Sequence, residues 1–193
     1  MKKILVVVDM QNDFIDGPLG TPEARDIVNN VCKKIREGEW NTVIRTMDSH
    51  NENLYLDSQE GKKLPVMHCI AKTDGWMMNK EVSYAIDCKC AWNNIKCLPV
   101  VKSKFGSDAL CNRIEPIYMY HGTEIHMVGV CTDTCVISNA LLLKTYFPEA
   151  RIVVDASCCA GSTYAKHLMA LEVMESCQID IVNKPCAWLK LID

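Results

Sequence analysis

The sequence lacks the features that mark membrane, fibrous, disordered and nucleic-acid-binding proteins. None of its apolar runs approaches the ~20 residues that a membrane span needs. Its charges nearly balance, with 24 acidic and 21 basic residues, so no electrostatic attraction to nucleic acid or to an anionic membrane is expected. Apolar residues make up 49% and charged residues 23%, which excludes disorder. The 193 residues are predicted to form a single domain, 1–193.

Cysteine is abundant, yet the paired CxxC motifs of zinc–thiolate sites are missing. The 12 cysteines fall below the ~8–10% share that marks a disulfide scaffold. The apolar run at the N-terminus, 4–8, is shorter than the ~7–15 residues of a signal-peptide core. We therefore expect reduced thiols and a cytoplasmic location. Cys88 with Cys90, and Cys158 with Cys159, are alternative metal sites, but buried apolar roles are the expectation for these thiols.

Short apolar runs alternate with helical segments along the chain. We predict strands at 3–9, 42–47, 98–102, 124–130, 151–155 and 178–182, and helices at 23–36, 135–147 and 165–177. Between 48 and 98 the pattern is irregular, with one short helix near 81–86. This alternation predicts an α/β fold with a mostly parallel sheet flanked by helices on both faces. Ligands of such sheets bind at the carboxyl ends of the strands. Chemically active side chains follow those ends: Asp9, Asp48, His50, Lys102, Cys131, Cys135 and Asp155.

Cys135 is the candidate nucleophile, because it lies where a predicted strand turns into a helix. Thr132 or Asp133 is predicted to cap that helix. In the first helical turn, free amides and the positive end of the helix dipole favour a thiolate and can bind an oxyanion. A buried thiol on an apolar helix is the alternative.

Asp9 and Lys102 each end a predicted strand and are placed at the same edge of the sheet. A carboxylate beside a cysteine can take the thiol proton, and a lysine can hold that carboxylate and the developing charge. A salt bridge at the rim of the sheet is the alternative, and Lys104 competes with Lys102 for the role.

Asp48 and His50 form a D-x-H element, and His68 follows 18 residues later. One carboxylate and two imidazoles suit zinc, iron or manganese, with water completing an open site. Asp57 and Glu60 lie between them as possible further ligands.

Four segments in this order resemble the nicotinamidase/isochorismatase-like cysteine hydrolases, over roughly 3–182. They are Asp-Met-Gln-Asn-Asp-Phe at 9–14, Asp-Ser-His at 48–50, Leu-Pro-Val-Met-His-Cys at 64–69 and Gly-Val-Cys-Thr-Asp-Thr-Cys-Val at 129–136. The resemblance implies a three-layer sandwich around a six-stranded, mostly parallel sheet. It also implies a catalytic triad of Asp9, Lys102 and Cys135.

The resemblance to the nicotinamidase branch further implies one divalent metal, zinc first, held by Asp48, His50 and His68. A cis peptide bond is expected at Val130–Cys131, with the amides of Cys131 and Cys135 directed at one oxyanion. The chain departs from the family after Lys102, where it reads Ser-Lys-Phe-Gly-Ser-Asp, and after Cys69, where a Gly-Thr-x-Gly element is absent.

These features predict a cysteine amidohydrolase of a small carboxamide, with nicotinamide as the first candidate. Phe14 and Trp76 are candidate walls for a substrate ring, or else part of the core. Isochorismatase-like vinyl-ether hydrolysis, which has no use for the metal, is the alternative enzyme. A receiver-like regulatory domain is a remote alternative that leaves Cys135 unexplained. The expected partners are the substrate and further copies of the chain, with no nucleic acid and no membrane.

Overall fold

The sheet has six strands, all parallel, in the order β3-β2-β1-β4-β5-β6. A computed structural model describes residues 2–118 and 122–184. The strands are β1 (Lys2–Val8), β2 (Thr42–Asp48), β3 (Lys96–Lys102), β4 (Thr123–Val130), β5 (Arg151–Ala160) and β6 (Asp180–Val182). The predicted fold class is confirmed. The strand order reverses between β1 and β4, which is where a ligand site is expected in an open α/β sheet.

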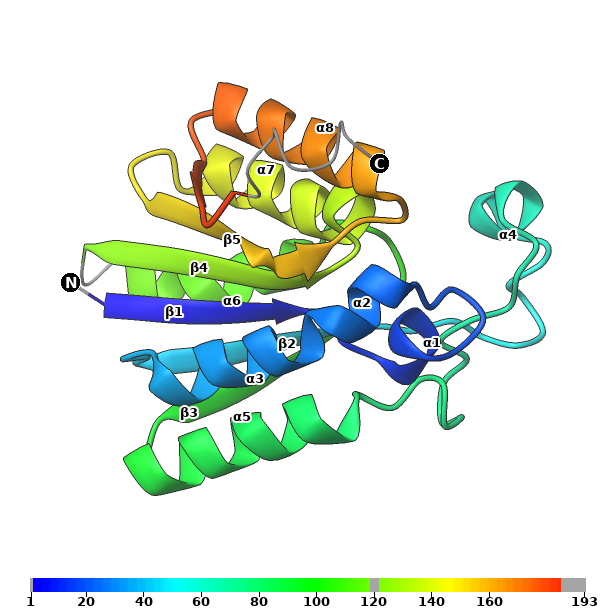
Figure 1. The fold of residues 1–193 in the computed structure, drawn as a ribbon, viewed down its shortest axis with the longest axis horizontal. Helices are drawn as coiled ribbons and strands as arrows, with labels where there is room; N and C mark the ends of the chain where they lie inside the picture. The colour runs from blue at the N-terminus through cyan, green and yellow to red at the C-terminus, as the bar shows by residue number, and fades with distance from the viewer. Residues whose placement is uncertain (1, 119–121, 185–193) are drawn as a thin grey trace, which may run out of the picture.

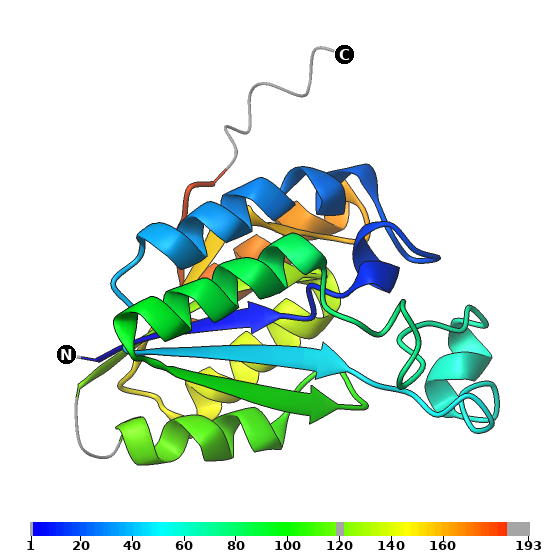
Figure 2. The same ribbon diagram turned by 90° about the horizontal axis from the view of Figure 1, so that it is seen from below.

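Helices cover both faces of the sheet, as Figures 1 and 2 show. One face carries α1 (Asn12–Ile15), α2 (Pro22–Asp26), α3 (Val28–Glu37) and α5 (Lys80–Asn93), and the other carries α6 (Asp108–Tyr118), α7 (Ile137–Tyr146) and α8 (Tyr164–Ser176). A π-helical turn, η1 (Thr132–Val136), leads from β4 into α7, and α4 (Gln59–Lys63) lies apart from both layers.

The central strand β1 supplies both halves of the core. Ile4, Val6 and Val8 point into the cluster under α6, α7 and α8, whereas Leu5 and Val7 point into the cluster under α3 and α5. All five side chains are fully buried. The uninterrupted apolar run therefore reflects a strand that is covered on both faces, as in parallel sheets generally.

Several helices differ from the prediction. The helix expected at 23–36 is divided at Ile27 into α2 and α3. The stretch 48–98 contains the 14-residue α5, where only a short helix was expected, and also α4. Helix α6 was not predicted, because its Pro116 and its short apolar pattern conceal it.

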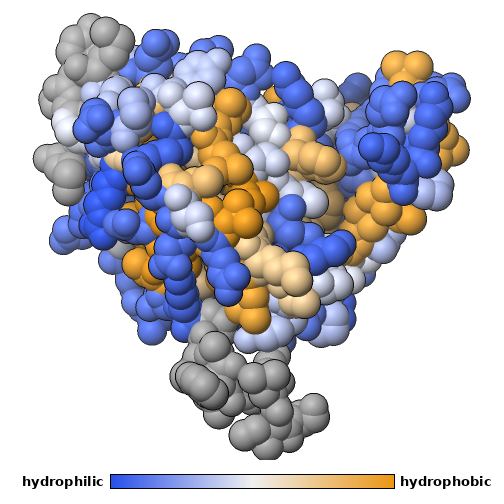
Figure 3. Space-filling model, turned by 90° about the horizontal axis from the view of Figure 1, so that it is seen from above, coloured by the Kyte–Doolittle hydropathy of each residue, from blue (hydrophilic) through white to orange (hydrophobic). Residues whose placement is uncertain are grey.

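The segment between β2 and α5 forms a lobe that stands away from the body of the protein, at the right in Figure 1. In the space-filling view a hollow separates this lobe from the body (Figure 3). A cavity of about 710 Å³ is lined by ten residues between Ser49 and Leu64 of the lobe and by Ser103, Lys104 and Phe105. None of the helices in the described part of the chain has the length and apolar character needed to cross a membrane.

Candidate active site

The carboxyl ends of three strands bring Asp9, Lys102 and Cys135 into contact. Asp9 directly follows β1, Lys102 ends β3, and Cys135 lies in η1 after β4. Lys102 Nζ lies 2.6 Å from Asp9 Oδ2 and 3.4 Å from Cys135 Sγ. All three residues are buried, with exposed fractions of 5% or less. The parallel topology thus assembles the acid, the cation and the thiol that the sequence indicated at one edge of the sheet.

Burial and charge set the protonation of these three groups. Burial raises the pKa of the Asp9 carboxyl, and the Lys102 ammonium only partly offsets this effect. Burial also raises the pKa of the Cys135 thiol well above its ordinary value, and the negative charge of Asp9 raises it further. Burial lowers the pKa of Lys102, but the charges of Asp9 and Cys135 outweigh this effect and keep it raised. Burial and the charge of Asp9 thus favour the neutral thiol of Cys135, and they oppose the effect of the nearby helix start, which favours the thiolate.

The turn that carries Cys135 is fixed by contacts to the segment around α8. Thr132 Oγ1 lies 2.8 Å from His167 Nδ1, and Asp133 accepts hydrogen bonds from the backbone and hydroxyl of Ser162 at 2.7 and 2.6 Å. The expectation that Thr132 or Asp133 caps the helix is wrong, because both side chains bond to this other segment instead. The peptide bond Val130–Cys131 is cis, as expected.

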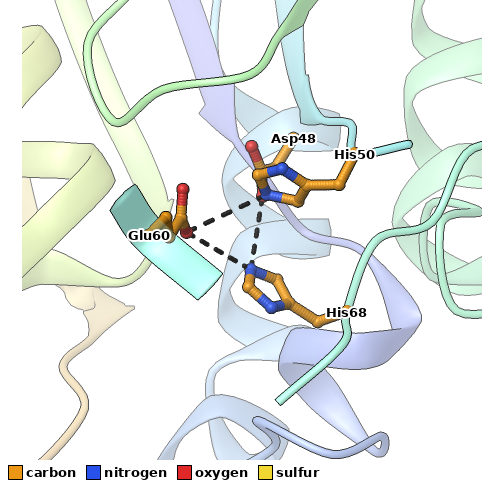
Figure 4. Close-up of side chains that lie close together, drawn as sticks. All are labelled: Asp48, His50, Glu60 and His68. Carbon is orange, nitrogen blue, oxygen red and sulfur yellow. Dashed lines mark hydrogen bonds and ion pairs between the residues drawn. The ribbon is translucent and has the colours of Figure 1, made fainter. Parts of the chain in front are cut away.

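Four potential ligands lie beside the triad: Asp48, His50, Glu60 and His68. Their ligand atoms all lie within 4.8 Å of one another (Figure 4). Asp48 Oδ2 is 2.7 Å from His50 Nε2 and 3.5 Å from His68 Nε2, and Glu60 Oε1 is 3.6 Å from His68 Nε2. Asp57 is not part of this cluster, so Glu60 is the further ligand candidate.

The tautomer of His68 fits a metal ligand. Its Nδ1 lies 2.8 Å from the carbonyl oxygen of Val66, which can only accept, so Nδ1 carries the proton. Nε2 then turns a lone pair toward Glu60 and Asp48. A second hydrogen bond that fixes the tautomer is typical of histidine ligands. Two imidazoles and two carboxylates suit zinc, iron or manganese.

The opening motif 9–14 supports the four ligand candidates as well as the triad, which the sequence did not reveal. The Gln11 side chain accepts a hydrogen bond from the Asp48 amide at 2.7 Å and donates to the Asp48 and Trp76 carbonyls. Asp13 Oδ2 accepts from the Cys69 amide at 2.7 Å, next to His68. Gln11 and Asp13 therefore fix the backbone on either side of the ligands.

Aromatic rings surround the cluster, although not all as predicted. The Phe14 ring lies 5.4 Å from His68, and Tyr55, which the sequence did not single out, lies 4.9 Å from His50. Trp76 packs against the core and bonds to Gln11 through its carbonyl group. Phe105 is 47% exposed on the wall of the 710 Å³ cavity, which also includes the ligand candidates His50 and Glu60.

Asn139 is a further site residue that the sequence analysis missed. Its side chain is fully buried and donates to the carbonyl oxygens of Cys135 and Phe105 at 2.7 and 2.9 Å. It also accepts from the Ser107 amide at 3.0 Å. Asn139 thus joins the turn that carries Cys135 to the loop after Lys102. An asparagine on an apolar helix, one turn after Cys135, was the available signal.

Two predicted candidates lie outside the site. Asp155 bonds instead to Lys34 at 2.7 Å and to Ser157 and Asn183. Lys104 is exposed and pairs with Asp108 at 3.2 Å, which leaves Lys102 as the site lysine. Every cysteine in the described part of the chain is unpaired.

Two curated relatives match the chain along most of its length. An uncharacterised isochorismatase family protein of Bacillus subtilis is 28% identical and covers 89% of this chain and 93% of its own. The nicotinamidase of Saccharomyces cerevisiae is 24% identical, and the match covers 79% of this chain and 86% of the yeast protein. No family model matches.

Solved structures share the fold. A pyrazinamidase/nicotinamidase of Streptococcus mutans superposes with a TM-score of 0.75 at 22% identity, covering 94% of this chain and 100% of that one. The pyrazinamidase of Pyrococcus horikoshii in complex with zinc has a TM-score of 0.70 at 22% identity, covering 94% and 99%. An N-carbamoylsarcosine amidase of Thermoplasma acidophilum has a TM-score of 0.70 at 23% identity, covering 94% and 95%. The chain is thus similar to nicotinamidases and an isochorismatase family protein along most of its length, and it shares the fold of the solved nicotinamidases.

Proposed function

We propose that the protein is a cysteine-dependent amidohydrolase that cleaves the carbon–nitrogen bond of a small carboxamide. The contact of Asp9, Lys102 and Cys135 beside a four-residue metal cluster is the observation that carries the proposal. Nicotinamide, hydrolysed to nicotinate and ammonia, is the first candidate because two of the relatives are nicotinamidases. The N-carbamoylsarcosine amidase among the structural neighbours makes other amides the next candidates.

In the first half-reaction Asp9 takes the proton of the Cys135 thiol, and the sulfur attacks the carbonyl carbon of the amide. The raised pKa of Asp9 suits it to hold this proton, and Lys102 keeps the carboxylate in place. The amides of Cys131 and Cys135 are proposed to stabilise the oxyanion. The carbon–nitrogen bond then breaks, the nitrogen takes the proton from Asp9, and ammonia leaves a thioester on Cys135.

In the second half-reaction water resolves the thioester. Asp9 takes a proton from the water molecule as the water oxygen attacks the carbonyl carbon, and the carbon–sulfur bond breaks. The sulfur of Cys135 receives that proton from Asp9, and the carboxylic acid leaves. The same carboxylate thus acts as base and as acid in alternation.

Asp48, His50, Glu60 and His68 are the proposed ligands of one divalent metal, with zinc first. A bound metal supplies a Lewis acid that can hold a ring nitrogen of the substrate or a water molecule. Phe14 and Phe105 are the proposed contacts of the substrate ring, and Trp76 supports the site through Gln11.

The proposal is tested by ammonia release from nicotinamide, pyrazinamide and N-carbamoylsarcosine, with added zinc, iron or manganese and with a chelator. Cys135→Ala should abolish release, whereas Cys131→Ala, which keeps the backbone amide, should retain it. Activity that persists in Cys135→Ala contradicts the proposal. Chelator-insensitive hydrolysis of isochorismate without ammonia release favours the vinyl-ether alternative instead.

We also propose a cytoplasmic location and a homo-oligomer. The unpaired cysteines support the first, since reducing compartments keep thiols free. Size-exclusion chromatography with light scattering tests the second.

A further inference from the structure

Thr46 makes the closest contact to Asp9 from outside the triad. It lies on β2, is fully buried, and precedes the ligand candidate Asp48 by two residues. Its hydroxyl donates a hydrogen bond of 2.6 Å to Asp9 Oδ1. The same hydroxyl oxygen accepts from the Asp9 backbone amide at 3.2 Å, and the Thr46 carbonyl oxygen accepts from that amide at 3.3 Å.

These contacts fix the direction of the hydroxyl proton. The Asp9 amide can only donate, so it faces a lone pair of the Thr46 oxygen and cannot receive the proton. The carboxylate can only accept while it is ionised, so the single hydroxyl proton points to Oδ1. The Thr46 hydroxyl therefore occupies Oδ1 of Asp9. This leaves Oδ2, which lies 2.6 Å from Lys102 Nζ, as the oxygen that faces Lys102.

A carboxylate rotates about the bond to its Cβ unless both oxygens are held. Lys102 holds Oδ2 but is a point charge on a flexible chain, which fixes distance better than angle. Thr46 lies on a central strand, has a stiff β-branched side chain and contacts both the backbone and the side chain of Asp9. It therefore fixes the plane of the carboxylate.

We propose that Thr46 is a positioning residue for Asp9, which holds Oδ1 so that Oδ2 is the oxygen that takes the Cys135 proton. This inference rests on the proposed cysteine hydrolase function. It assigns a role to a hydroxyl that contacts neither the four ligand candidates nor the thiol. It predicts that removal of this hydroxyl slows the proton-transfer step and leaves substrate binding unchanged.

The test compares Thr46→Val, which keeps the shape and removes the hydroxyl, with Thr46→Ser, which restores the hydroxyl. Thr42→Val is the matched control, because Thr42 lies on the same strand and the same face, is buried, and has no contact with Asp9. With the carboxamide that wild type hydrolyses, Thr46→Val should lower kcat by about 10- to 100-fold with little change in KM. Thr46→Ser should recover most of the loss, and Thr42→Val should match wild type.

Metal content and thermal unfolding of each variant separate this role from a structural one, since Thr46 lies near Asp48. Full metal content and a wild-type Tm together with a low kcat support the positioning role. In the Asp9→Asn background, Thr46→Val should cause no further loss of kcat. A Thr46→Val enzyme with wild-type kcat, or a Thr46→Ser enzyme as slow as Thr46→Val, overturns the inference.

A second measurement does not depend on a substrate. Iodoacetamide alkylates Cys135 only as its proton leaves, so the rate, followed by mass spectrometry of the Cys135 peptide, should fall in Thr46→Val and recover in Thr46→Ser. Equal alkylation rates in wild type and Thr46→Val overturn the inference. Failure of wild type to release ammonia from any carboxamide contradicts the proposed function alone, and the alkylation rates still decide the role of Thr46.

Discussion

The carboxylate of Asp9 forms an ion pair with the ammonium group of Lys102 and places its negative charge near the buried thiol of Cys135. Lys102 lowers the pKa of Asp9 less than burial raises it, and Asp9 in turn raises the pKa of Cys135. Neither the acid nor the cation therefore acts alone, because each sets the protonation of the other. The proton transfer from Cys135 should depend on the pair as a unit.

A double-variant cycle measures this dependence. Asp9→Asn and Lys102→Met are each expected to lower kcat by about 10²-fold or more, and the double variant should lose little beyond the larger single loss. Steady-state kinetics with the best carboxamide supply the four rates. Lys104→Met is the control, because Lys104 is exposed and pairs with Asp108, and it should keep kcat. Losses that multiply indicate independent sites and contradict the coupled triad.

Glu60 and Asp57 allow a matched comparison of one acidic residue inside the group of ligand candidates with one outside it. Glu60→Gln should weaken binding of zinc by about tenfold or more, because the Glu60 carboxylate lies 3.6 Å from His68 Nε2 and 3.9 Å from His50 Nε2. Asp57→Asn should leave the affinity unchanged, since Asp57 lies outside the cluster. Competition titration with a zinc-binding dye gives both affinities. Equal affinities in the two variants exclude Glu60 as a ligand.

Among the elements, the buried strands were the most predictable, and the helices between β2 and β4, namely α4, α5 and α6, were the least. β1, β2 and β4 are covered on both faces; a continuous apolar run marks β1, and buried β-branched and other apolar residues mark β2 and β4. α5 lacks this signal, because Tyr84 and Trp92 are exposed while charged residues interrupt its pattern. Their exposure depends on how α5 packs against α3, and that contact between distant segments has no local trace in the sequence.

The loop between β3 and α6 is an element whose position depends on one side chain in α7. Asn139→Ala removes the buried partners of the Cys135 and Phe105 carbonyls and of the Ser107 amide. The free energy of unfolding should fall by about 2–3 kcal/mol, because buried backbone groups are left without partners. Urea unfolding measures the loss. Asn93→Ala, which removes an exposed bond to the Lys89 carbonyl, should change stability by less than about 0.5 kcal/mol.

For the molecule as a whole, the topology made most of the site predictable. Parallel strands end at one edge, so Asp9, Asp48 and Lys102 could be placed together from strand ends alone. Asp155 shows the limit of this reasoning. β5 continues to Ala160, five residues beyond its predicted end, so Asp155 lies within the strand and away from the carboxyl edge. The contact of Thr46 with Asp9 joins segments 37 residues apart and left no pattern to detect, whereas the polar Asn139 on an apolar helix was the one trace of its own contacts.

Asp155 instead links α3 to the sheet and contributes to the stability of the whole molecule. It is 2% exposed and accepts from Lys34, Ser157 and Asn183. Burial raises the pKa of its carboxyl, but these hydrogen bonds outweigh burial and hold the pKa below its ordinary value. A group whose pKa is lowered on folding stabilises the fold above its unfolded pKa, and the contribution is lost as the pH falls through the folded pKa.

Asp155→Asn should therefore lower the free energy of unfolding by about 2–3 kcal/mol at pH 7, since it leaves Lys34 without its partner. The difference from wild type should shrink as the pH falls below about 4, where the wild-type carboxyl also becomes protonated. Asp180→Asn is the control, because Asp180 forms an exposed pair with Arg151 at 2.7 Å, and it should cost less than about 1 kcal/mol at pH 7. Urea unfolding at pH 7 and at several values between pH 5 and pH 3 measures both variants. A loss in Asp155→Asn that stays constant down to pH 3 contradicts the ionic role, because it assigns the effect to packing and not to the charge of the carboxylate.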